Sequence, residues 1–145
     1  MFKKSCAVIL AMFIACSFWV AYSKPLFLDY SDEFETYSNL KSAGEIERQN
    51  KNSFTYVFIR YGEGITLDKQ SVKKLKLNKD KIFLEFNAKE VKTSASAVGT
   101  SFYGYSKNIK YCEIVDGKKI NLHVFVSKDG SLSVGSPIIY GSFWF

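Results

Sequence analysis

GKKINLHVFVSKDGSLSVGSPIIYGSF, residues 117–143, is the most regular part of the chain. Every second residue on one side of it is apolar, namely Ile120, Leu122, Val124, Val126, Leu132 and Val134. Successive side chains of a strand point to opposite faces, so this alternation predicts two β-strands that share a core face. The Asp129-Gly130 pair between the two runs predicts a hairpin turn. We therefore expect an antiparallel pair of strands here.

The ends of this hairpin and its second face are also marked in the sequence. Asp116-Gly117 predicts a tight turn ahead of the first strand. Pro137 has no backbone N–H, so segment 138–143 is expected to begin at a sheet edge or a bulge. His123 alternates with the apolar residues, which puts it on the second face, and we expect that face to be the less buried one.

The segments before residue 65 predict one helix and two strands. Apolar residues at steps of three favour a helix over residues 31–41. Alternation predicts a strand over 45–49, and β-branched and aromatic residues predict another over 54–61, apolar on both faces. Gly62 and Gly64 are expected to end that second strand.

Residues 67–87 return to a helical period in two short segments. Asn78 is expected to cap the second segment and Asn87 to close it. Two short strands are then predicted around Val91 and over 102–105. The whole pattern predicts an α+β domain: an antiparallel sheet with two or so helices packed on one face, preceded by an N-terminal signal or anchor helix.

The first 23 residues have the composition of a targeting segment. Lys3 and Lys4 precede an uncharged run over residues 5–22, the layout of a secretory signal, and cleavage before Lys24 fits the small residues ahead of it. The run also reaches the lower length limit of a membrane span, so an uncleaved anchor is an alternative. A third alternative is lipidation at Cys16. All three place the rest of the chain outside the cytoplasm.

The remaining residues, 24–145, suit a single domain with a modest core. Without Lys3 and Lys4, 18 of the 20 basic residues remain against 14 acidic ones, a net charge of +4. Cys112 is the only cysteine left, so we expect no internal disulfide.

Four short motifs stand out in the C-terminal half: Asn87-Ala88, Tyr103 to Ser106, Gly117 to Asn121 and Gly135 to Ile139. Through these motifs the chain, over about residues 82–143, resembles the YwmB-like proteins, which are exported proteins of spore-forming Firmicutes. The resemblance implies export, a fold similar to that of TATA-binding protein, and a sporulation-associated role. It brings no catalytic residue with it, and a similar fold does not imply DNA binding.

Catalytic and metal chemistry have little support in the sequence. His123 is the only histidine, and no second histidine or paired cysteines accompany it at a metal-binding spacing. Cys112 and His123 would be the nucleophile and base of an unrecognised envelope enzyme, which remains the alternative interpretation. We expect no catalytic residue, no metal site and no cofactor.

Two groups of residues are candidates for contact with a partner. The basic group is Lys69, Lys73, Lys74, Lys76, Lys79 and Lys81, of which the first four are the candidates for contact with an anionic wall or lipid surface. The chain has only two arginines, and base recognition favours arginine, so we expect no nucleic-acid partner. The aromatic residues Tyr103, Tyr105 and Trp144 are candidates for contact with an envelope protein.

The interpretation that unites these features is an exported, non-enzymatic binding or assembly protein of the bacterial cell envelope. It is expected to be secreted, or to be anchored in the cytoplasmic membrane by residues 5–22.

Overall fold

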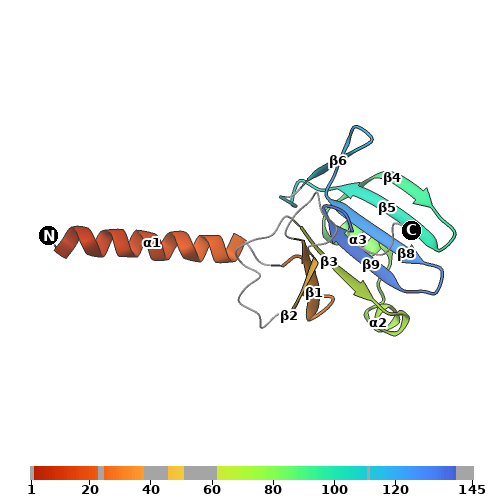
Figure 1. The fold of residues 1–145 in the computed structure, drawn as a ribbon, viewed down its shortest axis with the longest axis horizontal. Coiled ribbons are helices and arrows are strands. Elements are labelled where there is room, and N and C mark those ends of the chain that lie inside the picture. The colour runs from red at the N-terminus through yellow and green to blue at the C-terminus, as the bar shows by residue number, and fades with distance from the viewer. Residues whose placement is uncertain (1, 23–24, 38–45, 51–61, 111, 140–145) are drawn as a thin grey trace.

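The computed structural model describes residues 2–22, 25–37, 46–50, 62–110 and 112–139 (Figure 1). Its helices are α1 (Phe2–Tyr22), α2 (Lys69–Leu75) and α3 (Lys79–Glu85). Its strands are β1 (Glu33–Tyr37), β2 (Ile46–Asn50), β3 (Gly62–Leu67), β4 (Lys89–Ala95), β5 (Gly99–Tyr105), β6 (Glu113–Val115), β7 (Lys118–Ile120), β8 (Leu122–Ser127) and β9 (Leu132–Ser136).

Seven of the strands form one antiparallel sheet, in the order β2-β1-β3-β9-β8-β5-β4. The strands β6 and β7 form a separate hairpin. The central pairing joins β3 to β9, from Glu63 opposite Ser136 to Leu67 opposite Leu132. This pairing brings the strands of the N-terminal half beside those of the C-terminal half. The expected mixed fold with an antiparallel sheet is confirmed.

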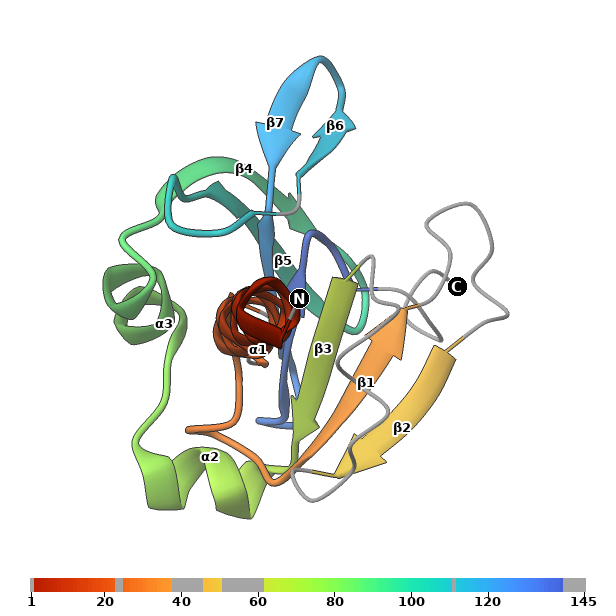
Figure 2. The same cartoon turned by 90° about the vertical axis from the view of Figure 1, so that its left-hand side faces the viewer.

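The main core lies on the sheet face that α2 and α3 cover (Figure 2). Leu122, Val124 and Val134 of the sheet pack there with Ile82 and Phe83 of α3. A Cβ atom at Gly104 of β5 would clash with the Phe83 ring, so α3 lies directly on that strand. The alternation in residues 122–134 therefore predicts the core face correctly.

Residues 25–30 complete this core as a turn that follows α1. Phe27 is only 1% exposed and meets the ring of Phe86 edge-on, with the ring centroids 5.6 Å apart. The backbone N–H of Leu26 donates to the carboxylate of Glu63, which is buried on the same face of β3 as Ile65. Residues 26–27 are therefore part of the folded core.

The helix predicted over residues 31–41 is wrong, because residues 33–37 form strand β1 and residues 38–41 lie outside the described part. Phe34 faces the main core, and Tyr37 lies on the opposite face, as strand geometry requires. The three-residue spacing of Phe34 and Tyr37 fits a helix, but pairing with β2 and β3 decides the conformation.

Gly62 and Gly64 were expected to end a strand, and instead both lie in β3. A Cβ atom at Gly64 would clash with the hydroxyl of Tyr37, and one at Gly62 would clash with the carbonyl oxygen of Ser136 and the ring of Pro137. Close approach of these neighbours therefore requires glycine at both positions. The strand predicted over 54–61 lies outside the described residues, whereas the one predicted over 45–49 corresponds to β2.

The predicted turns and caps are confirmed. Asp116 and Gly117 both have positive φ, at 51° and 74°, as a two-residue hairpin between β6 and β7 requires. Gly130 has φ of 93° in the turn between β8 and β9. The side chain of Asn78 accepts from the N–H of Lys81 at 2.8 Å and caps α3. Asn87 follows α3 with φ of 50°.

The second face of the sheet is more buried than expected. His123 and Phe125 are 4% and 5% exposed, although they alternate with the core residues of β8. Ile120 also departs from the prediction, because it packs with Tyr103 and Ile138 and not with the main core. The ladder of β9 ends at Ser136, before Pro137, and Ile138 and Ile139 lie against Gly135. The rest of segment 138–143 lies outside the described residues.

Helix α1 extends away from the sheet domain (Figure 1). In the part of the chain that the structure describes, no helix combines the length and the apolar character of a membrane span.

The packing of Phe27 predicts a large loss of stability on truncation. Phe27→Ala should lower the free energy of unfolding by about 3–5 kcal/mol, because it empties a buried site between the turn and α3. Urea unfolding followed by circular dichroism measures this change.

Leu84→Ala is the matched control, since Leu84 is 81% exposed on α3 and its truncation should change stability by no more than about 0.5 kcal/mol. Equal effects of the two substitutions would mean that residues 25–30 do not belong to the folded core.

Candidate functional site

The structure places His123 in a row of residues across the second face of the sheet. Gly64, Gly135, His123, Tyr103 and Lys92 stand opposite one another in successive strands. The rings of His123 and Tyr103 stack with centroids 4.3 Å apart. The Nζ atom of Lys92 lies 5.9 Å from the Tyr103 ring centroid and pairs with the carboxylate of Asp116.

The hydrogen bonds of His123 make it a poor general base. The backbone N–H of Ile139 donates to Nδ1 at 3.1 Å, so the lone pair on that nitrogen is occupied and the proton of the neutral ring lies on Nε2. Nε2 is buried and has no hydrogen-bond partner among the described residues. Burial lowers the pKa of His123 from 6.5 to about 3, which keeps the ring neutral near pH 7.

Cys112 has a different environment from His123. Its side chain is exposed, and its Sγ atom lies 3.7 Å from the carbonyl oxygen of Glu113. A nucleophile and its base need a direct hydrogen bond, and no such bond joins these two side chains in the described contacts. Among the described residues, no three His, Cys, Asp or Glu side chains are grouped so that they could hold a metal ion.

The aromatic candidates Tyr103 and Tyr105 lie in different environments in the folded protein. Tyr103 is 7% exposed and packs with Ile120 and Ile138, so we treat it as a core residue and leave it out of any contact surface. Tyr105 is half-buried at the end of β5. Trp144 lies outside the described residues.

The lysine candidates stay together on the surface of α2. Lys69, Lys73 and Lys74 lie in the helix and Lys76 directly follows it, and all four side chains are exposed. We call these four residues the α2 lysine surface. None of them forms an ion pair within the described part of the chain. Half-buried Val72 and Leu75 hold the other side of the helix against the main core.

Lys79 and Lys81, the other members of the predicted basic group, are engaged within the protein. Lys79 pairs with Glu90 at 2.8 Å and lies 4.8 Å from the centroid of the Phe102 ring. Its hydrogen bond to Glu90 raises its pKa. Lys81 donates to the carbonyl oxygen of Leu75 at 3.3 Å. The candidates for contact with an anionic partner are therefore the four residues of the α2 lysine surface.

Both ends of α2 are held by specific groups. The carboxylate of Asp68 accepts from the N–H of Ser71 at 2.7 Å, and hydrogen bonding to Ser71 lowers its pKa. At the other end Lys76 has φ of 51°, and the N–H of Leu77 donates to the carbonyl of Val72 at 3.1 Å. Glycine is the usual residue at such a position.

Two buried polar residues were not foreseen from the sequence. Glu63 is buried beside the core, and the alternation with Ile65 and Leu67 is the signal that could have placed it there. Asn121 binds both backbone groups of Ser106 and the carbonyl of Ile109. These contacts hold the 106–109 loop against β8, so the role of Asn121 is structural.

Comparison of the chain with protein families, curated proteins and solved structures gives no significant match. The resemblance to the YwmB-like proteins therefore stays a prediction.

The buried neutral His123 predicts an acid-sensitive stability. Between pH 6.5 and about pH 3 the unfolded chain binds a proton that the folded protein does not. The free energy of unfolding is therefore independent of this residue above pH 6.5 and falls by up to about 1.4 kcal/mol per pH unit below it. Urea unfolding should therefore give a free energy of unfolding that is roughly 2 kcal/mol lower at pH 5 than at pH 7 because of His123.

His123→Gln is the control for this experiment, because glutamine can accept from Ile139 and does not titrate. The variant should lose about 2 kcal/mol less than the wild type between the two pH values. If both proteins lose the same free energy of unfolding between pH 7 and pH 5, the fold does not hold His123 neutral.

The left-handed conformation of Lys76 predicts a stabilising substitution. Lys76→Gly should raise the free energy of unfolding by about 1 kcal/mol, since glycine adopts positive φ without steric cost. Lys74→Gly, in the helix itself, should lower it by about 1 kcal/mol. Thermal unfolding of both variants checks the prediction, and destabilisation by Lys76→Gly would contradict it.

Proposed function

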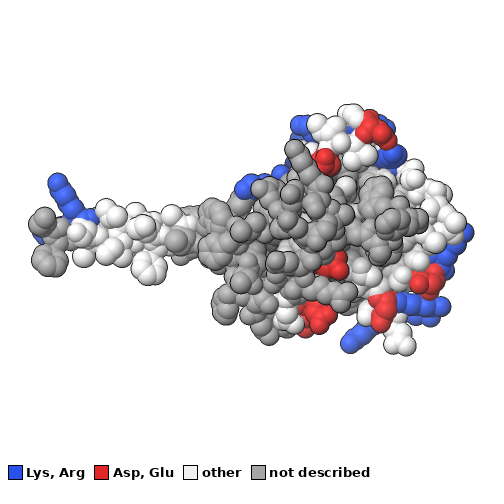
Figure 3. Space-filling model, in the orientation of Figure 1, with Lys and Arg blue, Asp and Glu red and all other residues white. Residues whose placement is uncertain are grey.

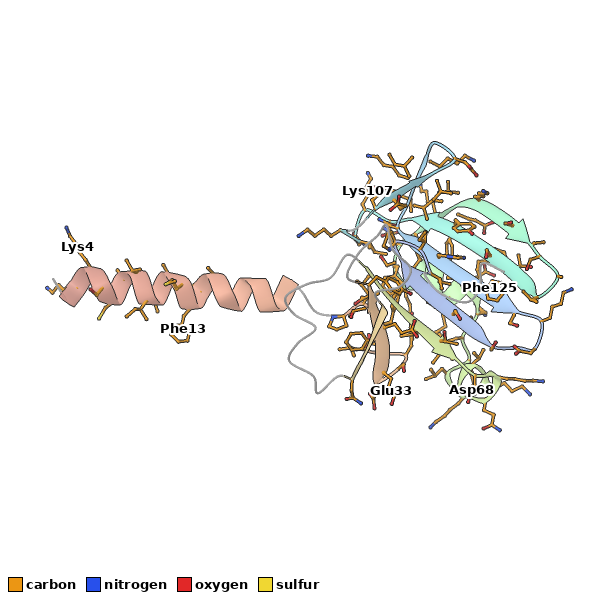
Figure 4. All side chains as sticks on the ribbon, viewed as in Figure 1. Lys4, Phe13, Glu33, Asp68, Lys107 and Phe125 are labelled. Atoms are coloured by element: carbon orange, nitrogen blue, oxygen red, sulfur yellow. The ribbon has the colours of Figure 1, made fainter. Side chains whose placement is uncertain are left out.

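We propose that this chain is an exported, non-enzymatic binding or assembly protein of the bacterial cell envelope, directed there by residues 1–23. The observation that carries the proposal is the surface of α1, where large apolar side chains are 49–70% exposed: Val8, Ile9, Leu10, Met12, Phe13 and Ile14. Figure 4 shows Phe13 pointing away from the helix and Lys4 near its outer end.

The energetics of α1 support export or membrane insertion. Each large apolar side chain that stays in water forgoes about 1.5–3 kcal/mol of burial free energy. A helix with apolar residues all round is stable when protein or lipid surrounds it. The two lysines at its start favour retention of that end in the cytoplasm, which places the sheet domain outside.

The described site residues support a binding role over catalysis. The buried ring of His123 makes its hydrogen bond through Nδ1, and Cys112 is exposed elsewhere. The α2 lysine surface presents four exposed lysines, of which Lys73, Lys74 and Lys76 form no ion pair in the described part of the chain. A protein of this kind acts through contact with another envelope component.

Cys112 offers a direct test of location. In the Cys6→Ser/Cys16→Ser variant Cys112 is the only thiol, and its side chain is exposed. A maleimide that does not cross membranes should label this variant in intact cells, because the thiol lies outside the cytoplasm. Mass spectrometry of the recovered protein measures the labelling and also shows whether the chain begins at Met1 or Lys24.

The control combines Lys3→Glu and Lys4→Glu with the same cysteine changes, which removes the charge that orients the segment. Labelling of this control in intact cells should fall. If the chain with Lys3 and Lys4 is labelled only after cell lysis, the protein is not exported and the proposal fails.

A further inference from the structure

The α2 lysine surface gathers four exposed lysines on one short helix and its C-terminal end. Lys69 and Lys73 are four residues apart and share one side of α2, and Lys76 follows the helix in a left-handed conformation. Like charges at this spacing destabilise a helix. In the described residues Lys79 and Lys92 pair with carboxylates, and Lys69 lies against Gly130, next to Asp129, whose pKa is lowered by hydrogen bonding and by the charge of Lys69. Lys73, Lys74 and Lys76 form no ion pair in the described part of the chain.

The backbone conformation of Lys76 is a further observation in favour of a role for its side chain in binding. Outside glycine, positive φ occurs in the described chain at Lys76, Asn87 and Asp116. Asn and Asp tolerate this region well, but a lysine there carries a steric cost that glycine would avoid. The chain thus keeps a cationic residue at the one place on this surface where stability favours glycine.

The composition of the surface indicates a diffuse polyanion as its partner. Residues 68–77 contain no arginine and no aromatic residue, the types that anchor specific protein interfaces. Lysine acts on phosphate as a mobile point charge without a fixed geometry. Several mobile ammonium groups in a row therefore fit a repeating chain of phosphates.

The position of α2 separates this surface from the membrane that α1 would enter. Along the long axis of the molecule β1, β2 and β3 lie between α1 and α2 (Figure 1). Figure 3 shows Lys atoms at the place of α2, with Asp or Glu atoms beside them, toward the end opposite α1. Attraction to a charged lipid surface falls off within a Debye length, about 8 Å at physiological salt.

We propose that the α2 lysine surface binds a phosphate-bearing anionic polymer on the side of the domain that faces away from α1. The proposal rests on the proposed function, since it names the class of envelope component that the exported domain contacts. The polymer contacts the four lysines and releases counterions as it binds.

Binding of the full chain to linear inorganic polyphosphate tests the proposal. The protein is kept in a non-ionic detergent, and affinity is measured by fluorescence anisotropy at several salt concentrations. Wild-type affinity should fall steadily as salt rises, because counterion release drives the binding. Replacing all four lysines of the surface by glutamine should weaken binding at low salt by about tenfold or more.

A second variant controls for net charge. It replaces Lys89, Lys107, Lys118 and Lys119 by glutamine, exposed lysines on β4, the 106–109 loop and β7. Both variants lose four positive charges, so they differ only in where the charge is removed. The control should bind polyphosphate within about twofold of the wild type. Equal loss in both variants would overturn the proposal, because general charge would then explain the binding.

Lys76→Gly separates binding from folding. Its affinity should fall although the substitution removes a steric cost, so weaker binding cannot arise from unfolding. Unchanged affinity in this variant would exclude Lys76 from the surface and overturn that part of the proposal.

The last experiment measures binding of the protein to vesicles of phosphatidylglycerol. If the wild type binds these vesicles through the four lysines but does not bind polyphosphate, the partner is a lipid surface and the proposal is wrong. Polyphosphate binding by the purified protein does not depend on export, and maleimide labelling does not depend on the four lysines. A failure of either proposal is therefore recognised separately.

Discussion

The pairing of β3 with β9 is the interaction on which the rest of the structure depends. It joins residues 63–67 to residues 132–136, so strands from the two halves of the chain become one sheet. Ile65 and Leu67 pack beside Val134 and Leu132 in the main core because this register aligns them. Contacts so distant in sequence carry a large loop-closure cost, which the apolar burial along the pair offsets.

The central strands β8 and β9 are then buried on both faces for most of their length, and this has consequences for chemistry. His123 is enclosed on the second face, where Ile139 occupies Nδ1 and burial holds the pKa down. Among the described residues Nε2 of His123 has no hydrogen-bond partner, and burial of such a polar group costs free energy. The row from Lys92 to His123 is best understood as packing between neighbouring strands.

Two exposed surfaces of the molecule differ in character. α1 exposes apolar side chains at one end of the molecule, and the α2 lysine surface exposes positive charge toward the other. The first suits lipid and the second suits an anionic polymer. The proposed role of the domain, to hold such a polymer outside the membrane, follows from this division.

Local sequence determined the elements whose signals are short-range. The turns at Asp116-Gly117 and Asp129-Gly130, the cap at Asn78 and the alternation of residues 122–134 follow from backbone sterics and strand geometry, so they were predictable. The lysines of α2 could also be recognised in the sequence, since a charge pattern does not depend on the fold.

Other features follow from the tertiary structure alone: residues 33–37 form a strand, Tyr103 and His123 are buried, and Lys79 is paired. These outcomes depend on partners far away in the chain: β3 for β1, the segment at Ile138 for Tyr103, and Glu90 for Lys79. Local propensity cannot encode such partners, because the free energy that selects them comes from packing and pairing across the whole sheet.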